Sequence, residues 1–143
     1  MIENFLSYLE NTARRVPDRV AYFNDKEFLT FSQLHKASQA IGSYLGAMMP
    51  SRSPVAVLMD GRSIWNIPAF LGVLYAGGFY TPMNVSLPGV MLSRLLTRLS
   101  PALILTDEKG WKALDGVPVS APVIGLEDAL GAAVDAEPLE KSA

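Results

Sequence analysis

The chain has 143 residues, of which half are hydrophobic and 18% charged, with a net charge of −2 and no cysteine. Disulfides, thiolate zinc sites and cysteine nucleophiles are therefore excluded, and the absence of a basic cluster makes nucleic acid and anionic membranes poor partners. The length predicts one domain with a substantial core. The acidic start does not fit a signal peptide and the apolar runs are too short to span a bilayer, so we expect a cytoplasmic protein.

The first thirty residues predict a helix followed by a β-hairpin. Apolar residues recur at helical spacing over residues 2–16, and Pro17 ends that pattern. Two strand-like segments, 19–23 and 27–29, then flank residues 24–26 (Asn-Asp-Lys), whose types favour a turn.

A second helix is predicted to begin at Thr30. Thr30 and Gln33 fit a capping box, in which the threonine accepts a hydrogen bond from the third backbone N–H and the glutamine reaches back. We expect this helix to end between Gly46 and Pro50. Its predicted buried stripe consists of Leu34, Ala37, Ile41, Tyr44, Leu45 and Met48.

A continuous apolar run, Pro54–Met59, is typical of a parallel strand covered on both faces. The loop Asp60-Gly61-Arg62-Ser63 follows, and Ser63 or Asn66 is the expected N-cap of the next helix. Pro68 is tolerable only in the first turn of that helix.

The stretch Leu71–Asn84 organises the rest of the chain. Its helical part is apolar on all sides, which indicates a buried helix. Gly77 and Gly78 then stop the helix, because glycine enters the left-handed conformation without a Cβ clash. We expect a short buried strand over residues 79–81, closed by Pro82.

After Asn84 the pattern predicts a helix that opens at residues 86–88, a strand over 102–106, a short helix over 107–114, a weak strand over 122–124 and a helical turn over 126–130. In the first of these helices, Arg94 and Arg98 should face outward. Five apolar residues should face inward: Met91, Leu92, Leu95, Leu96 and Leu99.

Four predicted strands begin near residues 54, 79, 102 and 122, and helical patterns separate the first three. This spacing indicates repeated β-α-β units. The expected fold is therefore α/β, a largely parallel sheet with helices on both faces plus an N-terminal β-hairpin. We predict one structural unit over 1–131 and a linker or disordered tail over 132–143.

The segment Leu74–Asn84, LYAGGFYTPMN, resembles the core motif LKAGxAYVPLD of adenylate-forming enzymes. Leu29–Leu34 is similar to their first motif, LTYxEL, and lies at the right distance before it. Leu87-Pro88 with Leu92 is similar to YPxxRL, and Leu103–Thr106 to the LLLT strand. The resemblance reaches about Gly125 and implies the N-terminal subdomain of such an enzyme.

The resemblance implies a parent enzyme that uses ATP and Mg²⁺ to activate a carboxylate as an adenylate and then transfers it to a thiol, on a carrier protein or CoA. The Pro-Lys-Gly phosphate loop and the motifs for adenine, ribose, acyl substrate and catalytic lysine are absent from these residues. We therefore assign no catalytic, cofactor-binding or metal-binding residue here, and expect the 143 residues alone to be inactive and to bind no cofactor.

Four residues depart from the family motifs. Asn84 replaces the usual aspartate, which weakens any charge-based role there, and Tyr75 replaces the usual lysine. Val90-Met91 replaces a usual charged pair. The Gly-Gly-Phe-Tyr form is closer to the amino-acid-activating branches, which include nonribosomal-peptide adenylation domains and D-alanine–carrier-protein ligases.

Several other residues could be given a functional interpretation, but each also has a simpler structural one. His35 is the only histidine, so we expect an ordinary solvated helix residue rather than a catalyst. Gly77-Gly78 follows a helix C-terminus, which repels anions, so it is no phosphate cradle. The loop 60–63 has the order strand, loop, helix of a ligand-site edge, or is simply a capped corner. Trp65 should be core and Trp111 half-buried cover.

Two kinds of function remain open from the sequence. The chain is the scaffold portion of an adenylate-forming ligase, or it is a stand-alone α/β binding or interaction module without catalysis. A truncated homologue that binds other synthetases is a third possibility. A subdomain without its nucleotide-binding partner should expose an apolar face, so we expect the isolated chain to form a homodimer, swap or aggregate.

Overall fold

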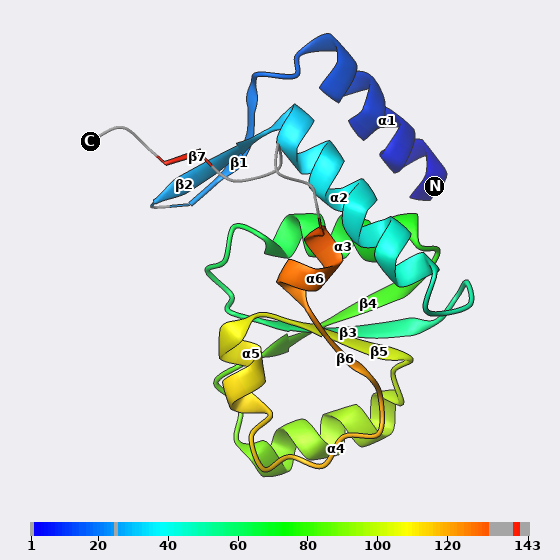
Figure 1. The fold of residues 1–143 in the computed structure, drawn as a ribbon, viewed down its shortest axis with the longest axis vertical. Coiled ribbons are helices and arrows are strands. Elements are labelled where there is room, and N and C mark those ends of the chain that lie inside the picture. Colours follow the sequence, from blue (N-terminus) through cyan, green and yellow to red (C-terminus); the bar gives the residue numbers. More distant parts are fainter. Residues whose placement is uncertain (1, 25, 132–138, 141–143) are drawn as a thin grey trace.

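The computed structural model describes residues 2–24, 26–131 and 139–140 (Figure 1). Within them, the expected helix, hairpin and β-α-β units all form. The elements in chain order are α1 (Ile2–Arg15), β1 (Val20–Phe23), β2 (Glu27–Thr30), α2 (Phe31–Gly46), β3 (Pro54–Met59), α3 (Asn66–Tyr75), β4 (Phe79–Asn84), α4 (Gly89–Leu99), β5 (Leu103–Thr106), α5 (Glu108–Ala113), β6 (Val123–Gly125), α6 (Leu126–Leu130) and β7 (Leu139–Glu140).

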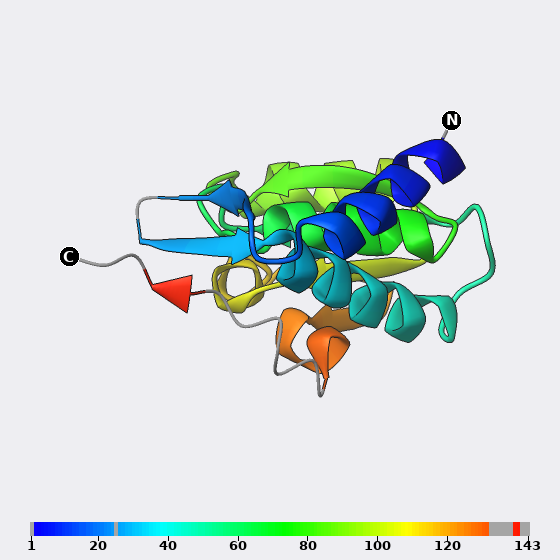
Figure 2. The same ribbon diagram turned by 90° about the horizontal axis from the view of Figure 1, so that it is seen from above.

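A parallel sheet in the order β4-β3-β5-β6 lies at the centre of the molecule. Helices α2, α3 and α6 cover one face, and α4 and α5 cover the other (Figure 1). The predicted α/β class, with a parallel sheet between helices, is confirmed. Seen from above, α1 lies along the outside of α2 and α3, so the helical side is two layers deep there (Figure 2).

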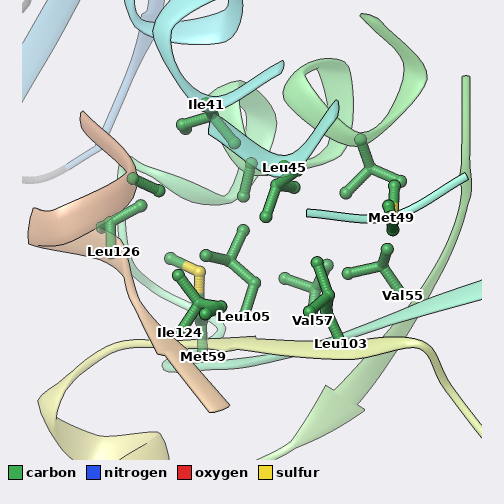
Figure 3. Close-up of a cluster of buried hydrophobic side chains, with 13 residues drawn as sticks. Ile41, Leu45, Met49, Val55, Val57, Met59, Leu103, Leu105, Ile124 and Leu126 are labelled. Atoms are coloured by element: carbon green, nitrogen blue, oxygen red, sulfur yellow. The ribbon is translucent and has the colours of Figure 1, made fainter. Parts of the chain in front are cut away.

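The larger core lies between the sheet and α2, α3 and α6 (Figure 3). No described residue of α3 is exposed, as the all-apolar pattern predicts. Helices α2 and α3 approach closely because each carries a glycine at the contact. A Cβ at Gly72 would collide with Ile41, and a Cβ at Gly42 with Tyr75.

A second core lies between the sheet and helices α4 and α5. It is smaller than the first, and α4 contributes only two fully buried side chains, Leu92 and Leu96. The expected stripe of five is therefore wrong at two positions, since Met91 is 48% and Leu95 38% exposed. Helix α4 covers the sheet with a narrow stripe and leaves neighbouring apolar side chains in solvent.

The helix α2 begins with the predicted capping box: Gln33 N–H donates to Thr30 Oγ1 at 3.2 Å, and Thr30 N–H donates to Gln33 Oε1 at 2.9 Å. Its predicted stripe is wrong at its C-terminal end. Tyr44 and Met48 are exposed, and Met49, just after the helix, is buried instead. Met49 N–H donates to the Leu45 carbonyl at 3.2 Å, so the buried positions continue at a spacing of four residues from Ile41 through Leu45 to Met49.

Strand β4 differs from the expected short buried strand. It runs six residues, through Pro82, and only Met83 is buried. The reason is its place at the edge of the sheet, where half of its backbone groups have no partner strand in the described part of the chain and a missing donor costs little.

The corner before α3 also differs in detail from the prediction. Trp65, rather than Ser63 or Asn66, occupies the N-cap position, and it makes no side-chain cap bond. Ser63 Oγ instead accepts from Trp65 N–H at 3.1 Å, so the serine lies two residues before the N-cap position. Pro68 falls in the first turn of α3, which is the only part of the helix where we expected a proline to be tolerated.

The N-terminal hairpin β1–β2 forms as predicted, with Asn24 Oδ1 accepting from the N–H groups of Lys26 and Glu27. Residues 139–140 pair with β2 as an antiparallel strand. The predicted tail over 132–143 otherwise lies outside the described residues, and the boundary at 131 stays a prediction. None of the helices in the described part combines the length and apolar character needed to cross a membrane.

Candidate functional site

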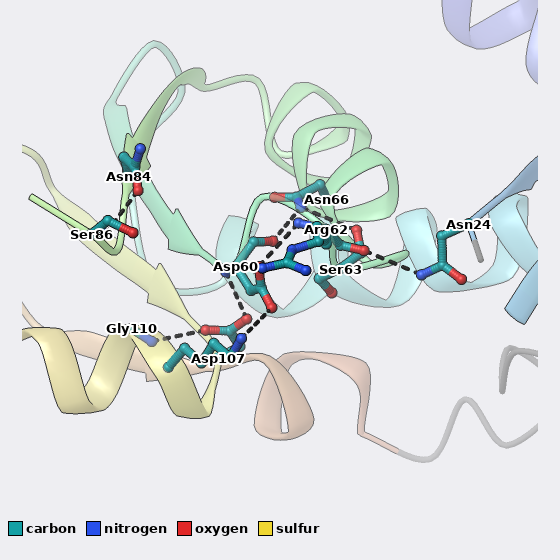
Figure 4. Close-up of polar contacts among 10 residues, drawn as sticks. Asn24, Asp60, Arg62, Ser63, Asn66, Asn84, Ser86, Asp107 and Gly110 are labelled. Atoms are coloured by element: carbon teal, nitrogen blue, oxygen red, sulfur yellow. Dashed lines mark hydrogen bonds and ion pairs between the residues drawn. The ribbon is translucent and has the colours of Figure 1, made fainter. Parts of the chain in front are cut away.

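A cleft of about 650 Å³ lies at the carboxyl ends of β3 and β5, where ligands bind in open α/β sheets. The loop 60–63, singled out from the sequence as a possible site edge, forms one wall. The segment around Asp107 at the start of α5 forms the second, and the β1–β2 hairpin forms the third. We call this site the β3–β5 cleft; Figure 4 shows its polar contacts.

Two carboxylates link the walls of the β3–β5 cleft. Asp60 N–H donates to Asp107 Oδ2 at 2.9 Å, and Gly110 N–H donates to Asp107 Oδ1 at 2.9 Å. Asp107 is thus the N-cap of α5 and also ties α5 to the end of β3 (Figure 4). Both of its oxygens are occupied by backbone donors.

Each carboxylate oxygen of Asp60 also has a partner within the chain. Arg62 N–H donates to Asp60 Oδ1 at 3.1 Å, and Lys109 Nζ lies 2.8 Å from Asp60 Oδ2. The hydrogen bond from Lys109, with that from the Arg62 backbone, lowers the pKa of Asp60 below its ordinary value of 3.8. The carboxylate stays ionised at neutral pH and is unsuited to act as a general acid.

The base of the β3–β5 cleft is closely packed. Thr106 Oγ1 donates to the Leu58 carbonyl at 2.7 Å, which ties β5 to β3 through a buried hydroxyl. Above it, Gly110 has no room for a side chain, because a Cβ would collide with Thr106 and the Leu58 carbonyl. Asn66 Nδ2 donates to the Asp60 carbonyl at 2.7 Å and Asn24 Nδ2 to the Arg62 carbonyl at 3.2 Å, so the 60–63 loop is held from both sides.

The residues of the β3–β5 cleft do not fit ATP or Mg²⁺. The N-terminus of α5 already holds the carboxylate of Asp107, which would repel a phosphate group. Each oxygen of Asp60 and Asp107 already has one partner within the chain, and among residues 2–24, 26–131 and 139–140 no cluster of three His, Asp or Glu side chains could hold a metal ion.

His35 is the one candidate whose surroundings differ from the prediction. It is half-buried rather than solvated, and its Nε2 atom lies 3.9 Å from Glu10 Oε1 without a hydrogen-bond partner in the described residues. Tyr75 O–H donates to the same Glu10 oxygen at 3.2 Å, and burial, then the nearby Glu10 charge, raises the pKa of Tyr75. The three side chains join α1, α2 and α3, so their role is to hold these helices together.

The remaining candidates have structural roles. Gly77 has φ +79°, the left-handed turn that stops α3, while a Cβ on Gly78 would meet the Ser53 carbonyl. Trp65 packs against the larger core, and Trp111 is half exposed as predicted. Asn84 Oδ1 accepts from Ser86 N–H at 2.8 Å, which forms a turn after β4.

Sequence reasoning missed Asp107 and Lys109. The signal for Asp107 was present, because an aspartate directly after a strand and before a short helix is a typical N-cap. Nothing in the sequence indicates that it bonds Asp60, since that contact depends on β5 lying next to β3.

Comparison with known proteins identifies the family of this chain. The family model described as AMP-binding enzyme matches residues 9–142. The chain belongs to the AMP-binding enzyme family. The resemblance of its motifs to adenylate-forming enzymes is thereby confirmed.

Two curated relatives show how much of a family member the chain represents. Tyrocidine synthase 1 of Brevibacillus parabrevis is 31% identical over 120 residues, which cover 83% of this chain and 11% of that protein. The D-alanine–D-alanyl carrier protein ligase of Lactiplantibacillus plantarum is 26% identical over 106 residues, or 73% of this chain and 21% of that protein. The chain therefore spans a small part of each relative.

Solved structures show the same fold. A nonribosomal peptide synthetase, FmoA3, superimposes with a TM-score of 0.76 and 23% identity over 94% of this chain and 14% of that chain. A fatty acyl-adenylate ligase from L. pneumophila superimposes with a TM-score of 0.74 and 24% identity over 93% of this chain and 25% of that chain.

Proposed function

We propose that this chain supplies the N-terminal scaffold of an ATP-dependent ligase, which activates an amino acid or another carboxylate as an adenylate and passes it to a thiol. The observation that carries the proposal is the family match over residues 9–142, together with curated relatives that include a tyrocidine synthase and a carrier protein ligase. In such a protein the 143 residues are inactive alone, and the remainder supplies the nucleotide-binding half.

The β3–β5 cleft supports a scaffold role for these residues. Its two carboxylates are engaged by backbone N–H groups and by Lys109, which gives both of them a structural role within the chain. In this proposal ATP and Mg²⁺ bind to the remainder of the ligase, a carrier protein or CoA supplies the thiol, and the whole works in the cytoplasm.

The first experiment is to measure the intact mass of the protein alongside the length of its encoding reading frame. If the frame continues into a Ser/Thr/Gly-rich loop that ends in Pro-Lys-Gly, the longer protein should catalyse ATP–pyrophosphate exchange with one of a panel of carboxylates. The 143-residue chain, assayed in parallel, should catalyse none. Exchange by the short chain, or its absence with every carboxylate in the longer protein, would contradict the proposal.

The alternative is a stand-alone binding module without catalysis. It is favoured by one observation, the apolar side chains that β4 and α4 leave exposed. The expectation that the isolated chain forms a homodimer through an exposed apolar face is tested separately, by light scattering at high concentration. A monomer at every concentration would contradict self-association through that face.

A further inference from the structure

The outer edge of the sheet carries a groove between β4 and α4. Its walls are Thr81, Pro82 and Met83 on β4, and Leu95, Arg98 and Leu99 on α4, around a volume of about 510 Å³. We call it the β4–α4 groove. Other large apolar side chains of the same two elements are exposed as well, Phe79 on β4 and Val90 and Met91 on α4, while Tyr80 stacks on Phe70 of α3 on the other face of the sheet. Monomeric proteins seldom leave so many neighbouring apolar side chains uncovered without a binding role.

The charge around the β4–α4 groove has one sign. No aspartate or glutamate occurs between Asp60 and Asp107, so β4 and α4 carry no acidic side chain at all. Arg94 and Arg98 are both exposed, and neither has an ion-pair partner among residues 2–24, 26–131 and 139–140. They are spaced by four residues, as are Met91 and Leu95, so α4 presents a basic row beside an apolar row.

The backbone edge of β4 is poorly suited to receive another strand. Phe79 N–H donates to the Ser53 carbonyl on the β3 side. Because backbone groups alternate sides along a strand, those of Tyr80, Pro82 and Asn84 face outward. Pro82 has no N–H to donate, and it lies in the middle of that outward row. A partner must therefore use the side chains of the β4–α4 groove rather than extend the sheet.

We propose that the β4–α4 groove binds an acidic amphipathic helix of a partner protein. The apolar face of such a helix would lie in the groove, and its flanking carboxylates would pair with Arg94 and Arg98. A second copy of this chain is a poor occupant, because a symmetric contact through α4 would bring the same unpaired arginines together. The inference concerns docking alone and is independent of the adenylation chemistry.

The test uses two designed helical peptides that share one leucine face and differ only in the flanking residues, glutamate in one and lysine in the other. Binding to the 143-residue chain is followed by fluorescence anisotropy in the absence of ATP, so a failed ligase assay does not affect the result. We expect the glutamate peptide to bind at least about tenfold more tightly and to weaken with added salt.

A matched pair of variants makes the test specific. Arg98 and Arg15 are both exposed arginines in the last turn of their helices, so Arg98→Glu and Arg15→Glu disturb the helix dipole alike. Arg98→Glu should weaken the glutamate peptide about tenfold, and Arg15→Glu less than about twofold. Leu95→Ser should weaken both peptides.

Three outcomes would overturn the proposal. The first is equal binding of the two peptides, or no binding of either. The second is an equal effect of Arg98→Glu and Arg15→Glu. The third is a homodimer of the free chain that the glutamate peptide disrupts, because the groove would then be a contact between two copies.

Discussion

The sheet is open at two places, and they are built in opposite ways. The β3–β5 cleft, at the carboxyl ends of the strands, is polar, and each oxygen of its two carboxylates has a partner within the chain. The β4–α4 groove, at the lateral edge, is apolar, and its arginines have no acidic partner in the described residues. Open α/β sheets usually bind ligands at the carboxyl ends of their strands, but here the polar groups of the β3–β5 cleft bond to one another. The β4–α4 groove instead has exposed side chains that a partner could contact.

This contrast bears on function because side chains bonded to one another within the chain contribute to its stability. Asp60 and Asp107 hold the loops after two neighbouring strands in a fixed relation. Their loss should therefore appear in stability. Changes in the groove should instead alter binding and leave the free energy of unfolding almost unchanged.

The largest expected loss of stability comes from a mutation in the core, and a similar mutation in the groove should cost much less. Leu105 is fully buried, so Leu105→Ala should lower the free energy of unfolding by about 3 kcal/mol. Leu95→Ala, in the groove, removes a side chain that is 38% exposed and should cost well under about 1.5 kcal/mol. Urea denaturation of both variants measures the difference. Equal losses would mean that the groove belongs to the core.

The close packing of the β3–β5 cleft predicts the next effect. Gly110→Ala places a methyl group against Thr106 and the Leu58 carbonyl, and should cost about 2–3 kcal/mol although alanine is the better helix former. Gly61→Ala is the control, because a Cβ there meets nothing within 4 Å. Thermal unfolding should show a lower Tm for the first variant alone; a tolerated Gly110→Ala would contradict the packing.

Asp107→Ala tests the link between the walls of the β3–β5 cleft. It removes the acceptor of two backbone N–H groups and should cost about 2 kcal/mol. Asp107→Asn keeps one amide oxygen as acceptor and should cost about half as much. Asp115→Ala, at an exposed turn, is the control in urea denaturation. A loss no greater than that of Asp115→Ala would show that the walls are independent.

The smallest effect is the pH dependence from Asp60. Its pKa is lowered in the folded state, so its stabilising contribution is present above the unfolded value of 3.8 and is lost as the pH falls through the folded value. Lys109→Gln removes the main cause of that lowering. The variant should be less stable than the wild type near neutral pH by under about 1 kcal/mol, because the pair is partly exposed.

The measurement for Asp60 is the difference in unfolding free energy between the two proteins as a function of pH. It should shrink toward zero in acid. Lys112→Gln, which breaks a fully exposed pair with Glu108, should show a smaller difference. A gap for Lys109→Gln that widened in acid would have the wrong sign for a lowered pKa.

The sequence predicts local structure well where one cause dominates. The capping box at Thr30 and Gln33 and the left-handed turn at Gly77 depend on neighbouring residues alone, and both form. The apolar run Pro54–Met59 predicts a central parallel strand, because only such a strand is covered on both faces.

Errors arise where distant parts of the chain decide. Periodicity places Met91 and Leu95 on the inner face of α4, but whether that face is covered depends on what stands beyond β4, an edge strand. Likewise, the bond between Asp60 and Asp107 joins residues 47 positions apart. It exists because β5 lies beside β3, which no local pattern specifies. The groove is uncovered because β4 is an edge strand, and the carboxylates of the cleft meet because β5 lies next to β3. Both features therefore depend on the order of the strands in the sheet.

The most direct test of this contrast is an amide-resolved NMR titration of the 143-residue chain, first with ATP and Mg²⁺ and then with the glutamate-flanked helical peptide. The account predicts that the peptide shifts amide signals in β4 and α4, residues 79–99, and that ATP with Mg²⁺ leaves the signals of residues 60–63 and 107–110 in place. Saturable shifts in the β3–β5 cleft on adding ATP, with none in the β4–α4 groove on adding peptide, would contradict it.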